Sequence, residues 1–200
     1  MLYTQYKDAA LKHLNACKTA LHGLKFYHGT TPLSQKKKED LLHNIFYLSG
    51  YTLECMINYA LYKRLRWTSQ EVHKLINSDY KIVYVKPTFW NQTTRRSEVK
   101  SFIDRIRNVT FTPNFWIAQH EFNKNVQLLH ILLPNSRVPI VDNSIHVPPN
   151  VHRMIFEIPN QKNHWRPELR YETTTPFSQT DIEEFVELTE QVYIQLLTVA

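Results

Sequence analysis

Apolar residues recur at every third or fourth position through residues 41–67, a stretch that contains no proline. This spacing predicts one long helix. Two apolar stripes run along the helix, so we expect other helices to pack on two of its sides. The stripes consist of Leu42, Ile45, Phe46, Ser49, Leu53, Met56, Ile57 and Ala60, and of Leu48, Tyr51, Cys55, Tyr59 and Tyr62.

One carboxylate and one small spot stand out within this central helix. Glu54 falls between the two apolar stripes, so we expect its side chain to be at least partly buried near the centre of a bundle. Ser49 and Gly50 form a spot where another backbone could approach closely. Because glycine inside a helix costs roughly 1 kcal/mol relative to alanine, we expect Gly50 to have a packing role.

The same apolar spacing predicts helices before and after the central helix in sequence. One of them, over residues 114–133, has about five turns and stops before Pro134. Thr180 and Glu183 form a capping box at the start of the last helix. The expected helices cover residues 3–21, 114–133, 151–158 and 180–199. Together with the central helix they predict an all-α fold, an up-and-down helical bundle.

Residues 68–113 depart from this pattern and are predicted to be an insertion of mixed structure between the second and third core helices. We expect a short helix that follows Thr68 and ends near Ile76. Residues 80–85 alternate and are β-branched, which favours an extended segment. A polar helix is expected over residues 94–108. The whole chain, residues 1–200, is then a single domain that carries this insertion.

The composition narrows the classes of protein to which the chain can belong. A length of 200 residues with 42% hydrophobic content suits one soluble domain with a core. The chain has three glycines, which argues against an all-β fold and excludes glycine-rich phosphate loops. The two cysteines lack metal-ligand spacing and the N-terminus lacks a secretory signal, which favours a cytoplasmic location. Residues 45–62 are too polar for a membrane span, so we expect no membrane association.

The charge adds a moderate bias toward anionic partners, since the formal net charge is +6 and the pI about 9.2. Lys and Arg form small clusters, as is typical of proteins that bind nucleic acid. These clusters are residues 36–38, Lys63 with Arg64 and Arg66, Arg95 with Arg96, and Arg105 with Arg107. The alternative interpretation is that the clusters are solvated helix ends.

Three short motifs occur in an order that a known helical family shares. They are Tyr47 to Cys55 in the central helix, residues 119–122 followed by Leu128 and Leu129, and residues 169–171 before the last helix. With these motifs the chain resembles the HEPN family, small helical bundles found beside or fused to nucleotidyltransferases. The resemblance implies a HEPN-like bundle that forms a homodimer. It also implies a role with RNA, a nucleotide or a nucleotidyltransferase partner, and some members are toxin-type ribonucleases.

The residue pair that the resemblance implies for catalysis is misplaced in this chain. Active HEPN ribonucleases carry an arginine followed by a histidine after four to six residues, commonly near the C-terminal helices. The match in this sequence is Arg66 with His73, at the end of the central helix. Short motifs of this kind also arise by chance. We therefore predict no catalytic residues and no appreciable ribonuclease activity.

The ten histidines show no ligand spacing such as H-E-x-x-H on a helix. We therefore predict no metal site, and we expect no cofactor. His120 is expected to be a structural residue that caps the start of a helix or forms a hydrogen bond there. A histidine at such a position is usually satisfied by its surroundings and needs no ligand to explain it.

The polar loop before the last helix is the predicted ligand-binding site, because loops held over a rigid scaffold often carry function. It contains His164, Arg166, Arg170 and Tyr171. A buried carboxylate needs a donor, so we predict that Glu54 pairs with Arg170 near the Tyr171 hydroxyl. Arginine can bridge a carboxylate bidentately, and this pair would pin the loop to the central helix. Arg166 or His164 would then be available to a ligand.

Two functional hypotheses follow from these residues and from the resemblance. The first is a non-catalytic HEPN-like module that binds a nucleotide, RNA or a nucleotidyltransferase partner. The second is a divergent, metal-independent endoribonuclease of toxin type that uses His164 or His120 and a nearby arginine. A third, structural interpretation is that the arginines only tie loops to carboxylates.

Overall fold

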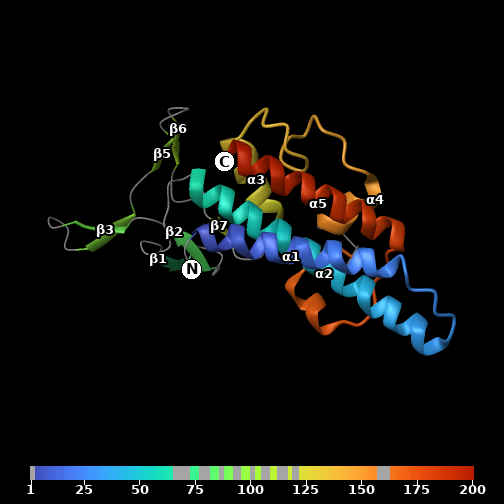
Figure 1. Cartoon of the computed structure of the whole chain (residues 1–200). Helices are drawn as coiled ribbons and strands as arrows, with labels where there is room; N and C mark the ends of the chain where they lie inside the picture. The colour runs from blue at the N-terminus through green and yellow to red at the C-terminus, as the bar shows by residue number, and fades with distance from the viewer. Residues whose placement is uncertain are drawn as a thin grey trace.

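The computed structural model describes residues 3–64, 122–156 and 163–200, together with the backbone of short strands between residues 73 and 118. The helical fold predicted from the sequence is confirmed (Figure 1). In chain order the described helices are α1 (Tyr3–Leu24), α2 (Pro32–Arg64), α3 (Phe122–Leu132), α4 (Pro149–Ile155), the 3-10 helix η2 (Pro167–Tyr171) and α5 (Gln179–Val199). None of them is both long enough and apolar enough to cross a lipid bilayer.

Helix α2 lies at the centre of the bundle, with α1 and α5 packed along it (Figure 1). Most residues between Leu42 and Tyr62 are buried, and Leu53, Met56 and Leu61 have no exposed surface. The expectation that α2 has neighbours on two sides is therefore confirmed. Each fully buried apolar side chain of this kind stabilises the fold by roughly 1.5–3 kcal/mol. Helix α2 therefore contributes a large part of the stability of the hydrophobic core.

Helix α2 begins at Pro32, upstream of the apolar stretch over residues 41–67 from which it was predicted. Thr31 precedes it and acts as its cap, since the Thr31 Oγ1 accepts a hydrogen bond from the backbone N–H of Ser34 at 3.2 Å. Proline is well tolerated in the first turn of a helix, where its missing N–H would have no helical partner.

The capping box of α5 is formed by Ser178 and Asp181, two residues before the predicted pair Thr180 and Glu183. The Ser178 Oγ accepts from the backbone N–H of Asp181 at 3.2 Å, and the Asp181 carboxylate accepts from the backbone N–H of Ser178 at 2.9 Å. Both pairs have the three-residue spacing of a capping box. The extended backbone at Ser178 decides between them, because a cap residue lies outside helical φ and ψ.

We expect Ser178→Ala to lower the free energy of unfolding by about 1 kcal/mol, because one N–H at the start of α5 loses its acceptor. Thr180→Ala is the matched control, since Thr180 is exposed and lies inside the helix. Chemical denaturation followed by circular dichroism measures both values. Equal losses for the two variants would contradict the assignment of the cap to Ser178.

Short antiparallel strands lie between α2 and α3 in sequence. They are β1 (His73–Ile76), β2 (Ile82–Val85), β3 (Thr88–Asn91), β4 (Arg96–Val99), β5 (Phe102–Asp104), β6 (Val109–Phe111) and β7 (Ile117–Ala118). The strand order is β1-β2-β7 in one sheet, with β3-β4 and β5-β6 as separate pairs. In the three-stranded sheet His73 lies opposite Val85 and Val83 lies opposite Ala118.

Two helix predictions in this region are wrong, whereas β2 (Ile82–Val85) lies within the segment over 80–85 that was expected to be extended. Strand β1 replaces the short helix after Thr68, and β4 and β5 replace the helix over 94–108. The helix over 114–133 is shorter, because Ile117–Ala118 pairs with β2 and α3 begins at Phe122. Apolar spacing over a few residues does not separate a strand from a helix, and the pairing that decides comes from segments distant in sequence.

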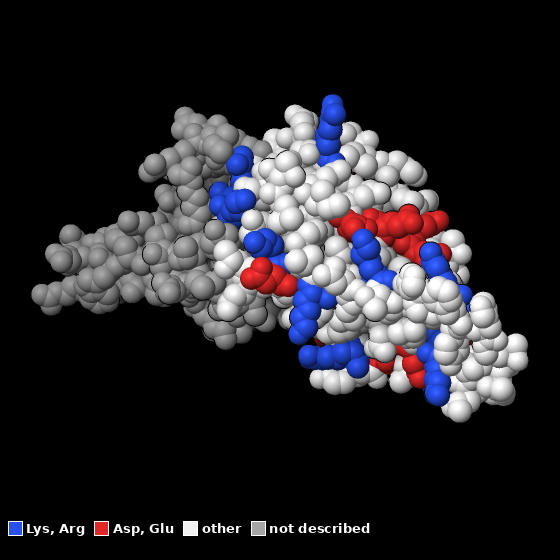
Figure 2. Space-filling model, in the orientation of Figure 1, with Lys and Arg blue, Asp and Glu red and all other residues white. Residues whose placement is uncertain are grey.

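Charge is unevenly distributed over the face drawn in Figure 2. Acidic side chains gather over the N-terminal half of α5, whereas Lys and Arg lie singly or in small groups. The predicted cation clusters are partly engaged, since Lys36 lies 3.6 Å from Asp40 and the Lys63 ammonium lies 5.4 Å from the ring centre of Tyr59. The side chains of the clusters between residues 65 and 121 lie outside the described residues.

Candidate functional site

The predicted binding loop is anchored to α2 by Trp165, whose side chain is 3% exposed. Its indole N–H donates to the backbone carbonyl of Tyr47 at 2.8 Å, and its backbone N–H donates to the carbonyl of Met154 at 2.7 Å. The indole lies directly against Gly50, where a Cβ atom would overlap the ring. The close approach expected at Gly50 is thus made by a side chain and not by a backbone.

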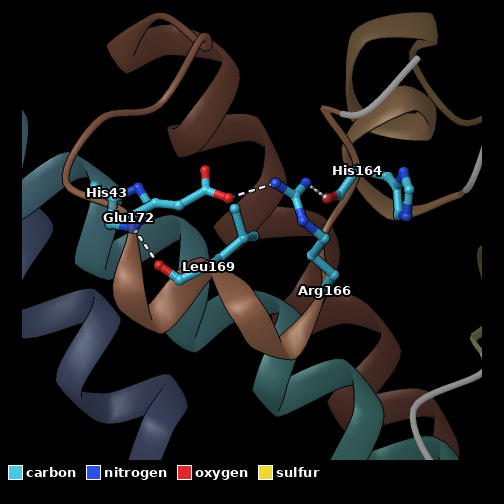
Figure 3. A network of polar contacts seen from close by, with 5 residues as sticks. All are labelled: His43, His164, Arg166, Leu169 and Glu172. Atoms are coloured by element: carbon cyan, nitrogen blue, oxygen red, sulfur yellow. Dashed lines mark hydrogen bonds and ion pairs between the residues drawn. The ribbon is translucent and has the colours of Figure 1, made fainter. Parts of the chain in front are cut away.

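A second anchor joins η2 to α2 through His43 and Leu169 (Figure 3). The Leu169 side chain is buried, and its carbonyl lies 2.8 Å from the Nε2 of the buried His43. Because a carbonyl only accepts, Nε2 must carry the proton of this hydrogen bond. Residues 163–175 are therefore held on both sides of Arg166, by a tryptophan before it and by a leucine carbonyl after it.

Arg166 spans the turn of the loop and forms an ion pair with Glu172 (Figure 3). Its guanidinium also donates to the backbone carbonyl of His164 at 3.5 Å. The imidazole of His164 points away from this guanidinium in Figure 3, and its buried Nδ1 has no hydrogen-bond partner among the described residues. Arg166 thus ties a loop to a carboxylate, as the structural interpretation of the arginines proposed. A ligand-binding role for Arg166 and His164 stays a prediction.

The end of η2 presents Arg170 and Tyr171 to solvent. Tyr171 is 76% exposed, and the Arg170 guanidinium carbon lies 4.9 Å from the centre of its ring. Beside them on α2, the rings of Tyr47 and Tyr51 stack with their centres 6.1 Å apart. We call Tyr47, Tyr51, Arg170 and Tyr171 the aromatic surface. Trp165 supports it from within, because its indole lies against both α2 tyrosines.

Glu54 lies close to the aromatic surface and is 8% exposed, which confirms that it is buried. Burial is the main cause that raises the pKa of Tyr47, the nearby Arg170 lowers it, and Glu54 and Tyr171 raise it further. Three of the predicted site residues, Glu54, Arg170 and Tyr171, are therefore brought within electrostatic reach of one hydroxyl. In the described part of the chain no ion pair joins Glu54 to Arg170, whose guanidinium lies over Tyr171.

The cysteines and the residue types that bind metals are further candidates for reactive groups in the described part of the chain. Burial raises the pKa of Cys17 to about 11 and that of Cys55 to about 12, so both thiols are protonated at neutral pH. Among the described residues no three His, Cys, Asp or Glu side chains are placed to hold a metal ion. His120 and the side chains of Arg66 and His73 lie outside the described residues, so their predicted roles stay predictions.

The sequence predicted two exposed residues of the surface and the buried carboxylate beside it, but not the residues that position the loop. Arg170, Tyr171 and Glu54 were predicted, whereas the anchors Trp165 and His43 were not. The sequence contained a signal for the Trp165 contact. A tryptophan in an otherwise polar loop and a glycine inside a buried helix both indicate that a large side chain packs against a small residue. No protein-family model, no curated protein and no solved structure matches this chain.

Proposed function

We propose that this protein is a non-catalytic, HEPN-like module that binds single-stranded RNA on the aromatic surface. One observation carries the proposal: an arginine and a tyrosine, Arg170 and Tyr171, stand exposed together on a short helix that is anchored at both Trp165 and Leu169. Exposed aromatic rings beside a cation are the combination that stacks unpaired bases and holds the adjoining phosphate.

The anchoring of the loop supports binding because it reduces the entropy lost when RNA is bound. Residues 163–175 hold their shape through the Trp165 and His43 contacts and the ion pair of Arg166 with Glu172. A surface that is already ordered loses less conformational freedom on binding than a mobile loop would. Two of the three aromatic rings of the surface come from α2, the central helix of the bundle. The stacking platform is thus rigid.

Charge disfavours one side of the molecule as the RNA-binding face. The acidic side chains over the first half of α5 repel phosphate (Figure 2). Arg170, by contrast, is exposed and its guanidinium lies over a ring, so it is available to a phosphate oxygen. The endoribonuclease alternative named His164 or His120 with an arginine nearby. The imidazole of His164 turns away from the guanidinium of Arg166 (Figure 3), which gives that pair no support, and His120 lies outside the described residues.

The test is the fluorescence anisotropy of a labelled, unstructured RNA oligonucleotide. We expect Tyr171→Ala and Arg170→Ala each to raise the Kd about tenfold, since stacking of one base is worth about 1–3 kcal/mol. The matched control is Arg153→Ala, which removes an exposed arginine from α4. It should change the Kd only slightly. Affinity should also fall as salt is raised, because phosphate contacts release counterions.

Two outcomes would overturn the proposal. One is that the wild-type protein does not bind the RNA at moderate salt. The other is that Arg153→Ala weakens binding as much as Arg170→Ala does. The affinity would then depend on the net charge of the protein and not on the aromatic surface. Cleavage of the RNA during the titration, detected on a denaturing gel, would instead favour the endoribonuclease alternative.

A further inference from the structure

A second candidate site lies between α3, α4 and the loop that joins them. This pocket has a volume of about 580 Å³ and shares no residue with the aromatic surface. Pockets that hold drug-sized ligands usually measure about 300–1,000 Å³. Its lining contains both aliphatic side chains and side chains that can form hydrogen bonds. The pocket is therefore large enough for one small molecule and offers both contact surface and polar recognition.

The wall of the pocket that the loop between α3 and α4 forms is preorganised by hydrogen bonds. The Asp142 carboxylate accepts hydrogen bonds from the backbone N–H of Arg137 at 3.1 Å and from the backbone N–H of Ser144 at 3.0 Å. It also accepts from the Ser144 hydroxyl at 2.7 Å, the main cause that lowers the pKa of Asp142. The carbonyl of Val141 lies 2.7 Å from the His130 Nδ1. Asp142 is consequently ionised at neutral pH, and its loop is tied to α3.

One residue of this wall has an unusual backbone conformation. Ile140 has a φ of 67°, in the left-handed region that β-branched residues rarely adopt. Its side chain is nevertheless buried and lines the pocket. Such a conformation persists only where the surroundings impose it, and it is more common at ligand sites than elsewhere. Ile140 lies inside a hydrogen-bonded turn, in which the backbone N–H groups of Val141 and Asp142 donate to the carbonyl of Val138 at 3.1 and 2.9 Å.

The helix walls carry the groups that would recognise a ligand. Asn123 and Gln127 line the pocket one turn apart on α3, so their amides lie on the same face of the helix. The buried amide oxygen of Asn123 has no hydrogen-bond partner among the described residues. On α4 and just after it, the rings of His152 and Phe156 lie 4.6 Å apart and also line the pocket. The walls therefore combine amide donors and acceptors with flat aromatic rings.

The charge of the pocket restricts the ligand further. No Lys or Arg is among its lining residues in the described part of the chain, whereas the ionised carboxylate of Asp142 is. A phosphate group would meet that negative charge with no lysine or arginine of the lining to balance it. Amide side chains pair well with heterocycles that carry a donor and an acceptor side by side, as adenine does at N6 and N7. Aromatic and aliphatic walls suit the faces of such a ring.

We propose that this pocket binds an uncharged purine nucleoside, with the base between the α3 amides and the rings of His152 and Phe156. The proposal does not rest on RNA binding at the aromatic surface, because the two sites have no residue in common. A purine is favoured over a pyrimidine because its larger ring system gains more from stacking against aromatic walls.

Isothermal titration calorimetry with adenosine, AMP and cytidine tests this proposal on the full chain. We expect adenosine to bind, and AMP and cytidine to bind at least several-fold more weakly. Gln127→Leu should weaken adenosine binding about tenfold, since one bidentate amide pair is worth about that factor. Gln191→Leu, at an exposed position on α5, is the matched control and should leave the affinity unchanged.

Several results would overturn the proposal: no adenosine binding by the wild type, tighter binding of AMP or cytidine than of adenosine, or equal affinity in Gln127→Leu. Gln127 is an exposed residue, so this variant should fold, which circular dichroism checks. Asn123→Ala provides a second variant with the same expected loss. Unchanged RNA binding by Gln127→Leu would show that the two sites are independent, whereas a loss of RNA binding would contradict their separation.

Discussion

Trp165→Ala is expected to lower the free energy of unfolding by about 3–5 kcal/mol, the range for removal of a buried aromatic side chain. The residue is 3% exposed, and its indole fills the space between Gly50 and the two tyrosines of α2. Truncation also leaves the carbonyl of Tyr47 without its indole donor. Urea denaturation followed by circular dichroism measures the loss.

The same variant should release the binding loop while the helices remain folded. Hydrogen exchange should speed up at the backbone amides of residues 163–175, because the first of their two anchors is gone. Phe26→Ala is the control, since Phe26 is 69% exposed and its removal should change stability by less than about 0.5 kcal/mol. A Trp165→Ala protein with nearly wild-type stability would show that this segment is not anchored by the indole.

Gly50→Ala is expected to destabilise the protein by about 2 kcal/mol, although alanine is the better helix former by about 1 kcal/mol. A Cβ at residue 50 would overlap the indole of Trp165, so the ring must move and lose part of its burial and its hydrogen bond. Overpacking of a core usually costs about 1–3 kcal/mol and occasionally more. Displacement of a whole indole belongs at the upper end of that range, so the steric cost exceeds the gain in propensity.

Gly23→Ala is the matched control for this substitution. Gly23 is in α1, and no atom lies within 4 Å of a Cβ placed there. It should therefore stabilise the protein by up to about 1 kcal/mol through helix propensity alone. In the double variant of Gly50→Ala with Trp165→Ala, the added methyl group meets no ring, so its cost should largely disappear. Equal changes in the free energy of unfolding for Gly50→Ala and Gly23→Ala would contradict the packing of Trp165 against Gly50.

Much of the helical fold could be predicted because its signals are local. The stripes of α2 repeat over many turns, and the face of α5 runs from Ile182 to Leu196 without a break. Helix starts were harder to place, since Pro32 and Ser178 are acceptable both in a loop and at a cap. The strands were largely missed, because their hydrogen bonds join segments such as Val83 and Ala118 that are far apart in sequence.

The candidate site shows the same division between local and distant information. Arg170 and Tyr171 could be found as polar and aromatic residues in a loop, and Glu54 could be placed inside the bundle by its spacing. Their surroundings could not be found, since Trp165 meets Gly50 across more than one hundred residues of chain. The wall of the pocket includes a left-handed backbone at Ile140. Isoleucine rarely adopts this conformation, so the sequence does not predict it.

The two buried cysteines make this chain a convenient host for site-specific labelling. Cys17 and Cys55 are the cysteines of the whole sequence, and they are 0% and 5% exposed. With pKa values of about 11 and about 12, very little of either is present as the thiolate that reacts with a maleimide. A cysteine introduced at the exposed Gln191 would therefore react first. A dye could be attached there in the native fold, with both natural cysteines left in place.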